Sequence, residues 1–435
     1  MSTVRRSAEN MTRREWSVVL LLAASVIINY IDRSNLGIAA PVLEQQLSLS
    51  PLQMGSLLAA FSWTYALLQL IGISGWLTDR FPVGLVILWG YVVWSAATIA
   101  TGLVSGFAML FAARLLLGAG ESVAYPCYSR IFAELPQQHR GRANALIDAG
   151  TKLGPAAGAF VGGALLVHFG WRVLFLVLGI GGLAWILPWI KLMPRRQPGA
   201  PQVSEPTRST MELLGMRSAW GSFLGLFCGN YFFYFLLTWL PRYLVREAKM
   251  PLGATTRLTS VLFLWIALAT LSTGWISDHL IARGASVTRV RKTVLVGGLS
   301  VASSLVFTAV SAGNPLVTIT ILFFACIGYG AYASNHWAVS QTLAGPAMAG
   351  RWTSVQNGVG NLSGIAAPWV AGAVFQLNGS SRLAFFITGI VALIGALLWL
   401  FLVPRVEQVT WKLTPVADFP DLPVNSVVRG DESQH

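Results

Sequence analysis

The chain has 435 residues, of which 54% are hydrophobic and only 11% are charged. Soluble domains carry about 25% charged residues, and a soluble chain of this length cannot hide so much apolar sequence in one core. The composition therefore excludes a soluble protein and predicts an integral membrane protein. The cysteines have neither the spacing of a metal site nor that of a disulfide framework, so we expect no metal and simple packing roles for Cys127, Cys228 and Cys326.

The formal net charge of +13 does not mark one binding surface, because the basic residues follow the loops between apolar runs. Of the 30 Lys and Arg, 21 fall on one side of the predicted membrane, and the opposite side holds six, namely Arg172, Arg242, Arg246, Lys249, Arg257 and Arg382. The positive-inside rule places the richer side in the cytoplasm. We therefore expect a protein of the cell inner (plasma) membrane, with both termini cytoplasmic and with no nucleic-acid partner.

Apolar runs of about 20 residues are long enough to cross a bilayer. Residues 1–16 are polar and basic, and no cleavage pattern follows them, so we expect a cytoplasmic N-terminus and a retained first helix. Six runs then form a first predicted bundle over 17–193, at 17–40, 52–76, 83–104, 106–128, 143–167 and 172–193.

The stretch 194–217 contains four prolines and mixed charges, and it is predicted to be a cytoplasmic linker. The tail 404–435 is polar and contains proline, so we expect it to be cytoplasmic and mobile. Between them, six further runs form a second predicted bundle over 218–403, at 218–243, 258–277, 293–311, 315–344, 352–377 and 382–403.

An internal repeat relates the two sets of helices. The run Gly75-Trp-Leu-Thr-Asp-Arg80 closes the second helix, and Gly274-Trp-Ile-Ser-Asp-His279 closes the eighth, 199 residues later. Two copies of a six-helix unit form a transporter architecture, with the substrate site between them near the membrane midplane. The sequence therefore predicts an all-α integral membrane protein with twelve transmembrane helices in two pseudo-symmetric six-helix bundles.

Ionisable residues within the predicted spans are the main functional signal, because each buried charge costs at least ~2.5–3.5 kcal/mol and needs a reason. The second bundle has neutral polar residues at mid-depth, such as Asn335, His336 and Asn361. This asymmetry predicts a first bundle that handles charge and a second bundle that forms hydrogen bonds. All six ionisable residues belong to the first bundle: Asp32, Arg33, Arg114, Glu121, Asp148 and Lys152.

Two pairs of these residues share a helix face. Arg114 and Glu121 are seven residues apart, so the long Arg side chain can approach Glu121, while Asp148 and Lys152 at i,i+4 can pair directly. Such pairs can merely lock helices together. Alternatively, a substrate anion that competes for Arg114 promotes protonation of Glu121, which is the linkage that proton coupling needs.

The run Tyr30-Ile31-Asp32-Arg33 places an acid beside a base on helix 1. Arg33 offers a planar fork suited to a substrate carboxylate, and we place Tyr30 beside it as a substrate contact. Adjacent helix positions point ~100° apart, so Asp32 need not pair with Arg33 and can be a second proton site. Structural bridges to neighbouring helices are the alternative for both residues.

Polar and aromatic residues on other helices are candidates for binding a polyhydroxylated substrate. Tyr65 and Gln69 lie one turn apart on helix 2, where an ordinary packing role is equally compatible with the sequence. Asn357 precedes glycines that let helix 11 approach closely. On helix 7, an aromatic site wall and lipid-facing packing both fit Tyr231, Tyr234 and Trp239.

Charged loop residues at the predicted cytoplasmic face are candidates for a gate that latches one conformation. A carboxylate near a helix end can pair with an Arg or meet the N-terminus of a neighbouring helix. A purely topogenic role is the alternative. The gate candidates are Asp79, Arg80, Arg142 and Asp278.

Several runs carry a family resemblance: Asn29–Leu36, Leu237–Leu244, Asn357…Gly364, and the series Arg114…Gly118…Glu121…Tyr125-Pro126. With these motifs the chain resembles the major facilitator superfamily and, within it, the anion:cation symporter family. That family includes bacterial galactonate, glucarate and hexuronate transporters. The likeness covers roughly 15–405.

This resemblance implies that Asp32 and Glu121 bind protons, that Arg114 tunes Glu121, and that Arg33 grips the substrate carboxylate. It also implies that Tyr65 and Asn357 contact substrate hydroxyls, with Trp337 nearby. Two departures stand out: Phe81–Gly84 replace the usual Gly-Arg-Arg/Lys after Arg80, and Lys152 stands in a region where sugar-acid members have a neutral polar residue.

We therefore expect a proton-coupled symporter of a small organic anion, most simply a sugar acid such as an aldonate, aldarate or hexuronate. It would work as a monomer by alternating access, with the proton gradient as energy source and no cofactor. A proton antiporter that exports amphiphilic compounds is the first alternative. A membrane sensor is the second, and the absence of a nucleophile–base pair argues against an enzyme.

Overall fold

The computed structural model describes residues 11–133, 135, 137–193, 210–311, 314–345 and 348–411. The regular structure of these residues is entirely helical. The first half contains α2 (Arg13–Gln46), α3 (Pro51–Leu70), α4 (Ile73–Arg80), α5 (Val83–Leu103), α6 (Phe107–Glu121), α7 (Ala124–Ala133), α8 (Gln137–Ala157), the π-helical η1 (Gly158–Gly162), α9 (Gly163–Leu183) and α10 (Ile186–Leu192).

The second half begins with a short helix inside the predicted linker and continues with long helices. Its elements are α11 (Thr210–Leu214), α12 (Arg217–Arg246), α13 (Leu252–Ala282), α14 (Val287–Ser311), α15 (Pro315–Ala333), α16 (His336–Ala344), α17 (Ala349–Asn361), α18 (Ser363–Asn378) and α19 (Arg382–Leu402). The linker residues 194–209 lie outside the described residues.

Among the described residues, ten segments are long and apolar enough to cross a membrane. One of them, Leu146–Leu192, is two helices, because Gly170 interrupts the helix with φ 81° and ψ 171°. The second helix of the chain, formed by α3 and α4 with a left-handed residue at Gly72, completes the set. The described chain therefore has the predicted twelve transmembrane helices.

Local sequence explains where the first two long helices begin. Thr12 and Glu15 form a capping box that starts α2, and Ser50 and Gln53 form another that starts α3, with Pro51 in its first turn. Such boxes satisfy backbone N–H groups that a helix start leaves without a partner. The loop between the two helices comprises only residues 47–50.

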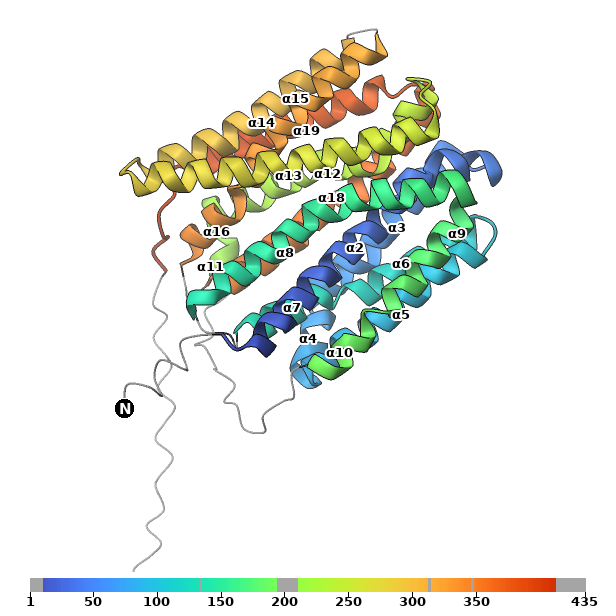
Figure 1. The fold of residues 1–435 in the computed structure, drawn as a ribbon. Coiled ribbons are helices and arrows are strands. Elements are labelled where there is room, and N and C mark those ends of the chain that lie inside the picture. The colour runs from blue at the N-terminus through green and yellow to red at the C-terminus, as the bar shows by residue number, and fades with distance from the viewer. Residues whose placement is uncertain are drawn as a thin grey trace, which may run out of the picture.

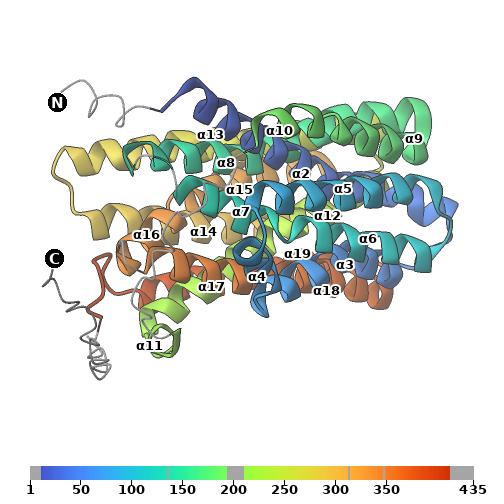
Figure 2. The same cartoon turned by 90° about the horizontal axis from the view of Figure 1, so that it is seen from below.

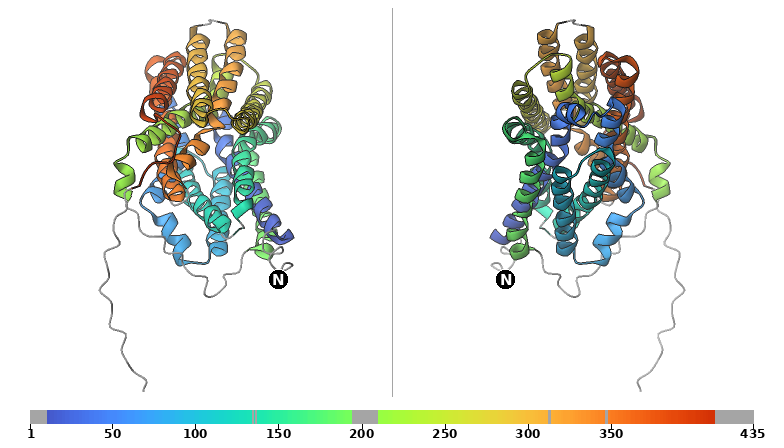
Figure 3. Two further views of the ribbon diagram at one scale, coloured as in Figure 1. Left: turned by 90° about the vertical axis from the view of Figure 1, so that its left-hand side faces the viewer. Right: turned by 90° about the vertical axis from the view of Figure 1, so that its right-hand side faces the viewer.

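The helices form two groups, coloured blue to green and yellow to red in Figure 1. Seen roughly along the helices, the two groups lie one above the other (Figure 3). From below, the helices of both groups run across the picture in roughly the same direction (Figure 2). The groups meet along α2 with α12, α3 with α18, and α8 with α13. The fold is the predicted pair of bundles with a shared inner face.

The two bundles are joined toward one end of the molecule. Glu44 of α2 accepts a hydrogen bond from Arg242 Nε of α12 at 2.7 Å, and Arg246 Nε lies 3.9 Å from the other carboxylate oxygen. The backbones also approach closely, since a Cβ on Gly37 would lie 2.5 Å from the carbonyl oxygen of Leu237. We name this contact region, with Glu44 at its centre, the Glu44 clamp.

Further hydrogen bonds join described residues of the two bundles between the Glu44 clamp and mid-depth. They include Leu52 N to Gln376 Oε1 at 3.2 Å and Ser260 Oγ to the Ala156 carbonyl at 2.8 Å. The opposite end carries the start of α2 and the end of α19. Among the described residues, these hydrogen bonds and ion pairs therefore lie between mid-depth and the end away from the start of α2.

Helices of both bundles are interrupted near mid-depth, and the interruptions fall in matching pairs. Helix 4 breaks after Glu121, where α6 ends, and helix 10 breaks before His336, where α16 begins. Helix 5 contains the π-helical η1, and helix 11 breaks at Leu362. Interrupted helices are typical of substrate sites in transporters, so the breaks point to the inner face between the bundles.

The expectation of a mobile tail from residue 404 is wrong for the part that the structure describes. Val406 N donates to Thr288 Oγ1 at 3.0 Å, and Val409 N donates to the Leu343 carbonyl at 3.0 Å. Trp411 Nε1 donates to the Ala344 carbonyl at 3.0 Å. These contacts fasten the segment to the second bundle because its Val and Trp side chains have apolar partners there.

Candidate functional site

The centre of the first bundle holds a buried ion pair between α2 and α6. Arg33 Nε donates to Glu121 Oε2 at 2.9 Å, and the two side chains are 3% and 0% exposed. Glu121 reaches this position because Gly118 and Gly120 let α6 pack closely against α3 and α5, where a Cβ would meet Phe61 and Trp94. The pair is shielded from water and sits at the break of helix 4.

Three aromatic rings surround the Arg33 guanidinium. Its central carbon lies 4.7 Å from the ring of Tyr30, 4.5 Å from Phe61 and 4.6 Å from Tyr65. Cation–π contacts of this kind stabilise a cation that has left water. The rings thus hold a dehydrated guanidinium ready for an anion.

Two further charges complete the cluster. Asp32 is 2% exposed and interacts electrostatically with Glu121 and Arg114, and Arg114 lies 5.7 Å from the Phe61 ring. Within the described residues, the atoms without a hydrogen-bond partner include Asp32 Oδ1, Arg33 Nη2, Arg114 Nε and Glu121 Oε1. A buried polar atom without a partner is costly, so this cluster is equipped to bind a polar ligand.

The expected approach of Arg114 to Glu121 is joined by a hydrogen bond to Glu121 from another helix. Arg114 acts on Glu121 electrostatically, but the hydrogen bond to the carboxylate comes from Arg33, 88 residues away in sequence. Two helical turns separate Arg114 from Glu121 by ~10 Å along α6, whereas the Arg33 side chain reaches the carboxylate from α2. The hydrogen-bond partner of Glu121 is therefore set by packing between helices and not by residue spacing within α6.

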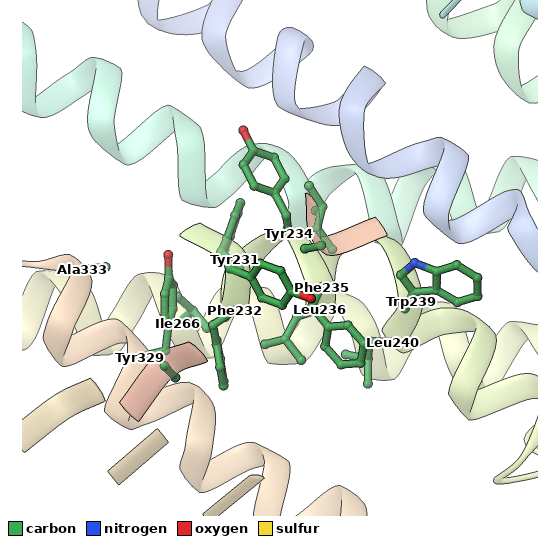
Figure 4. Close-up of a cluster of buried hydrophobic side chains, with 14 of the residues drawn as sticks. Tyr231, Phe232, Tyr234, Phe235, Leu236, Trp239, Leu240, Ile266, Tyr329 and Ala333 are labelled. Carbon is green, nitrogen blue, oxygen red and sulfur yellow. The ribbon is translucent and has the colours of Figure 1, made fainter. Parts of the chain in front are cut away.

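The second bundle faces this cluster with neutral groups. Tyr234 of α12 donates from its hydroxyl to Asn361 Oδ1 at 2.8 Å, and Asn361 Nδ2 donates to Asn357 Oδ1 at 3.0 Å. Figure 4 shows Tyr234 pointing from α12 toward the helices of the first bundle. Tyr234 also interacts electrostatically with Arg33, so the two bundles meet at this point.

The remaining predicted substrate contacts have different surroundings. Tyr65 is buried beside Arg33 and stacks on Phe61 at 5.2 Å, and Tyr30 flanks the same guanidinium. Gln69 Nε2 instead donates to the Ser122 carbonyl at 3.1 Å, which ties helix 2 to the break in helix 4. Trp337 follows His336 on α16, their rings 4.9 Å apart.

Asp148 and Lys152 pair directly, as their i,i+4 spacing predicts. Lys152 Nζ lies 3.4 Å from Asp148 Oδ1 and 2.8 Å from Thr151 Oγ1. Both charged residues also interact electrostatically with His336 of the second bundle. This second polar cluster lies beside the first one on the inner face.

The candidate gate is described only in part. The side chains of Asp79 and Arg142 lie outside the described residues, and Arg80 is exposed. Asp278 Oδ1 accepts a hydrogen bond from Arg291 Nη2 at 2.8 Å, and Arg291 Nη1 donates to Asn335 Oδ1 at 2.5 Å. In the second bundle, then, the end of helix 8 is fastened to helices 9 and 10.

Sequence reasoning missed two groups of residues. Phe61 lies in an apolar run that gives no signal, and its role follows only from its place under both guanidinium groups. Glu44 was not singled out, although the predicted outer side carries Arg242 and Arg246 with few acids near them. That surplus of cations was the signal that could have identified the Glu44 clamp.

Two bundles of membrane helices that enclose a buried charged cluster, and that the Glu44 clamp joins toward one end, define a membrane transporter. A model of the Major Facilitator Superfamily matches residues 22–368, so the chain belongs to that superfamily, and it is a transporter rather than an enzyme.

The comparisons agree with the predicted resemblance. The chain is 30% identical to the "Probable galactarate/D-glucarate transporter" of Escherichia coli strain K12, over 96% of this chain and 99% of the relative. It is 29% identical to the "D-galactonate transporter" of Escherichia coli O6:H1, over 91% and 97%. The chloroplastic ascorbate transporter of Arabidopsis thaliana is also 29% identical, over 89% and 74%.

A solved structure supports the fold. The bacterial homolog of the human lysosomal transporter Spinster, in an inward-facing and unoccupied conformation, matches with a TM-score of 0.75. The match covers 90% of this chain and 97% of that chain at 21% identity. At this identity, the likeness concerns the arrangement of the helices.

Proposed function

We propose that this protein is a proton-coupled symporter of a small organic anion, with a sugar acid as the substrate class. The Arg33–Glu121 pair carries this proposal. A guanidinium held by three rings and one carboxylate is a site for a second carboxylate, and that carboxylate would compete with Glu121.

Competition of this kind links the substrate to the proton. A substrate carboxylate that takes the Arg33 fork leaves Glu121 buried without its counter-ion, and an unpaired buried charge is far more costly than a neutral acid. Glu121 therefore takes up a proton when the anion binds. Asp32, buried beside Glu121 and Arg114, is the second proposed proton site.

The neutral groups of the second bundle would recognise the rest of the substrate. Tyr234, Asn361 and Asn357 form a chain of hydrogen bonds opposite Arg33, and their donors and acceptors suit the hydroxyl groups of a sugar acid. The names of the relatives, which include galactarate, D-glucarate and D-galactonate transporters, support the same class.

The contacts of the Glu44 clamp hold the bundles together on one side of the molecule, and this asymmetry supports alternating access. With both termini in the cytoplasm, as the distribution of Lys and Arg predicts, the Glu44 clamp closes the outer side and the inner face opens to the cytoplasm. We propose this inward-open arrangement for a monomer in the inner membrane, with the gate residues Asp79, Arg80, Arg142 and Asp278 closing the cytoplasmic side in the opposite state.

The test is uptake into proteoliposomes that contain the purified full-length protein, with an imposed inward proton gradient. Labelled hexonates, hexuronates and hexarates should accumulate above equilibrium, and a protonophore should abolish the accumulation. If no organic anion accumulates, symport is wrong. Proton-driven efflux of amphiphilic cations in the same vesicles would establish the antiporter instead.

A further inference from the structure

Lys152 is a third cation of the first bundle, outside the Arg33–Glu121 pair. Its side chain is 13% exposed, and it has one contact of 3.4 Å with Asp148 and one of 2.8 Å with Thr151. An ammonium group has three donor hydrogens, so the described contacts leave one for a further acceptor. Asp148 is 39% exposed, so its carboxylate remains accessible to water and is only loosely bound to the lysine.

His336 approaches the same place from the second bundle. It begins α16 at the break of helix 10, is 5% exposed, and interacts electrostatically with both Lys152 and Asp148. Its ring interacts with the Ala333 backbone, but among the described residues its buried Nδ1 makes no hydrogen bond of ordinary length and angle. A polar atom nine-tenths buried and without such a hydrogen bond, facing a lysine across the two bundles, indicates a position for a ligand.

The packing of α8 on α2 sets the depth of Lys152 relative to Arg33. A Cβ on Gly150 would meet Val26, one on Gly154 would meet Tyr30, and η1 continues this register. Position 33 is therefore level with 157, and Lys152 lies five residues closer to the helix N-termini. Five residues correspond to ~7.5 Å along the helix axis.

We infer that Lys152, with His336 opposite, forms a second carboxylate subsite, and that the preferred substrate is therefore a six-carbon dicarboxylate of the aldarate type. This inference rests on the proposed function, in which Arg33 binds the first carboxylate. The two carboxyl carbons of an extended six-carbon diacid lie ~6 Å apart, from C–C bonds of about 1.5 Å. Each carboxylate also needs a contact distance of about 3 Å to its cation, so such a diacid can reach from Arg33 to a cation at a different depth, whereas a monocarboxylate has one charged end only.

The first test compares a hexarate with the corresponding hexonate, which lacks the second carboxylate. Lys152→Gln should raise the KM for the hexarate by about 10-fold or more, because a charged hydrogen bond is lost, with a much smaller change for the hexonate. kcat should change little for either substrate. The Lys152→Arg variant should restore most of the preference for the hexarate, since it retains a cation.

A matched control removes a lysine elsewhere. Lys292 of α14 donates to the carbonyls of Leu400 and Pro404, so Lys292→Gln should leave the ratio of the two KM values unchanged. Thermal stability of each purified variant in detergent distinguishes a loss of binding from a loss of fold.

Asp148 provides a second, independent test. If Asp148 only restrains Lys152, then Asp148→Asn frees the ammonium and lowers the KM for the hexarate. If the pair is a structural bridge, Asp148→Asn and Lys152→Gln weaken transport of both substrates to the same extent, and the subsite is wrong.

The outcomes separate this inference from the proposed function. Driven uptake of the hexonate, together with equal or weaker uptake of the hexarate by the unaltered protein, overturns the subsite and leaves symport intact. Absence of driven uptake for every organic anion overturns the proposed function itself.

Discussion

The two bundles share one architecture but divide the chemistry between them. The first buries Arg33, Asp32, Arg114 and Glu121 on its inner face, whereas the second presents the neutral chain from Tyr234 through Asn361. A cation in a membrane is tolerated when rings and a carboxylate replace its water, and the first bundle supplies both. A symmetric backbone can therefore carry an asymmetric function.

The largest effect is expected at Arg33, the proposed binding group for the substrate carboxylate in the first bundle. Arg33→Lys keeps the charge but loses the planar fork, so kcat/KM for uptake and for counterflow should fall by about 100-fold, or ~3 kcal/mol. The control is Arg172→Lys, because Arg172 packs on Trp171 within α9, on the predicted outer side of the membrane. Retention of more than half of the activity by Arg33→Lys would refute its role as anchor.

The coupling carboxylate should show a selective effect. Glu121→Gln cannot exchange a proton, so accumulation driven by a proton gradient should disappear, while exchange of labelled for unlabelled substrate continues at a reduced rate. Both assays use the same proteoliposomes, which makes exchange the internal control. Full retention of driven uptake would remove Glu121 from coupling.

A smaller effect is expected in the neutral bundle. Tyr234→Phe removes the hydroxyl that Asn361 binds, so the KM should rise about 5- to 30-fold, from a loss of ~1–2 kcal/mol, with coupling to the proton gradient unchanged. Tyr231→Phe, one turn away on α12, serves as the matched control. An uncoupled Tyr234→Phe variant would contradict the division between the bundles.

The smallest effect is expected at the Glu44 clamp, which joins the bundles without touching the charged cluster. Glu44→Gln should weaken the ion pair with Arg242 by about 1 kcal/mol and shift the balance toward outer opening by about 5-fold. The readout is the rate at which a membrane-impermeant thiol reagent labels Gln376→Cys.

The control for the clamp is Glu247→Gln, since Glu247 accepts hydrogen bonds from Ser381 within the second bundle alone. Equal labelling rates in the two variants would show that Glu44 does not hold the outer side closed.

Much of the fold was predictable from the sequence, because a bilayer imposes a length on every crossing and a charge pattern on every loop. The matching helix breaks in the two bundles could not be predicted from the sequence. A helix ends at Glu121 and another begins at His336, and both positions lie inside segments that read as single membrane spans. The close packing of Gly118 on the Phe61 backbone, one turn before the break after Glu121, likewise appears only in the tertiary structure.

The sequence by itself determined that the central charges Asp32, Arg33, Arg114 and Glu121 lie within the membrane helices of the first half of the chain. Only the tertiary structure decided their partners. Arg33 and Glu121 are 88 residues apart, and Lys152 and His336 belong to different bundles, so no local periodicity relates them. Contacts between helices depend on the packing of whole faces, which fixes the ion pair, the ring cage and the Glu44 clamp together.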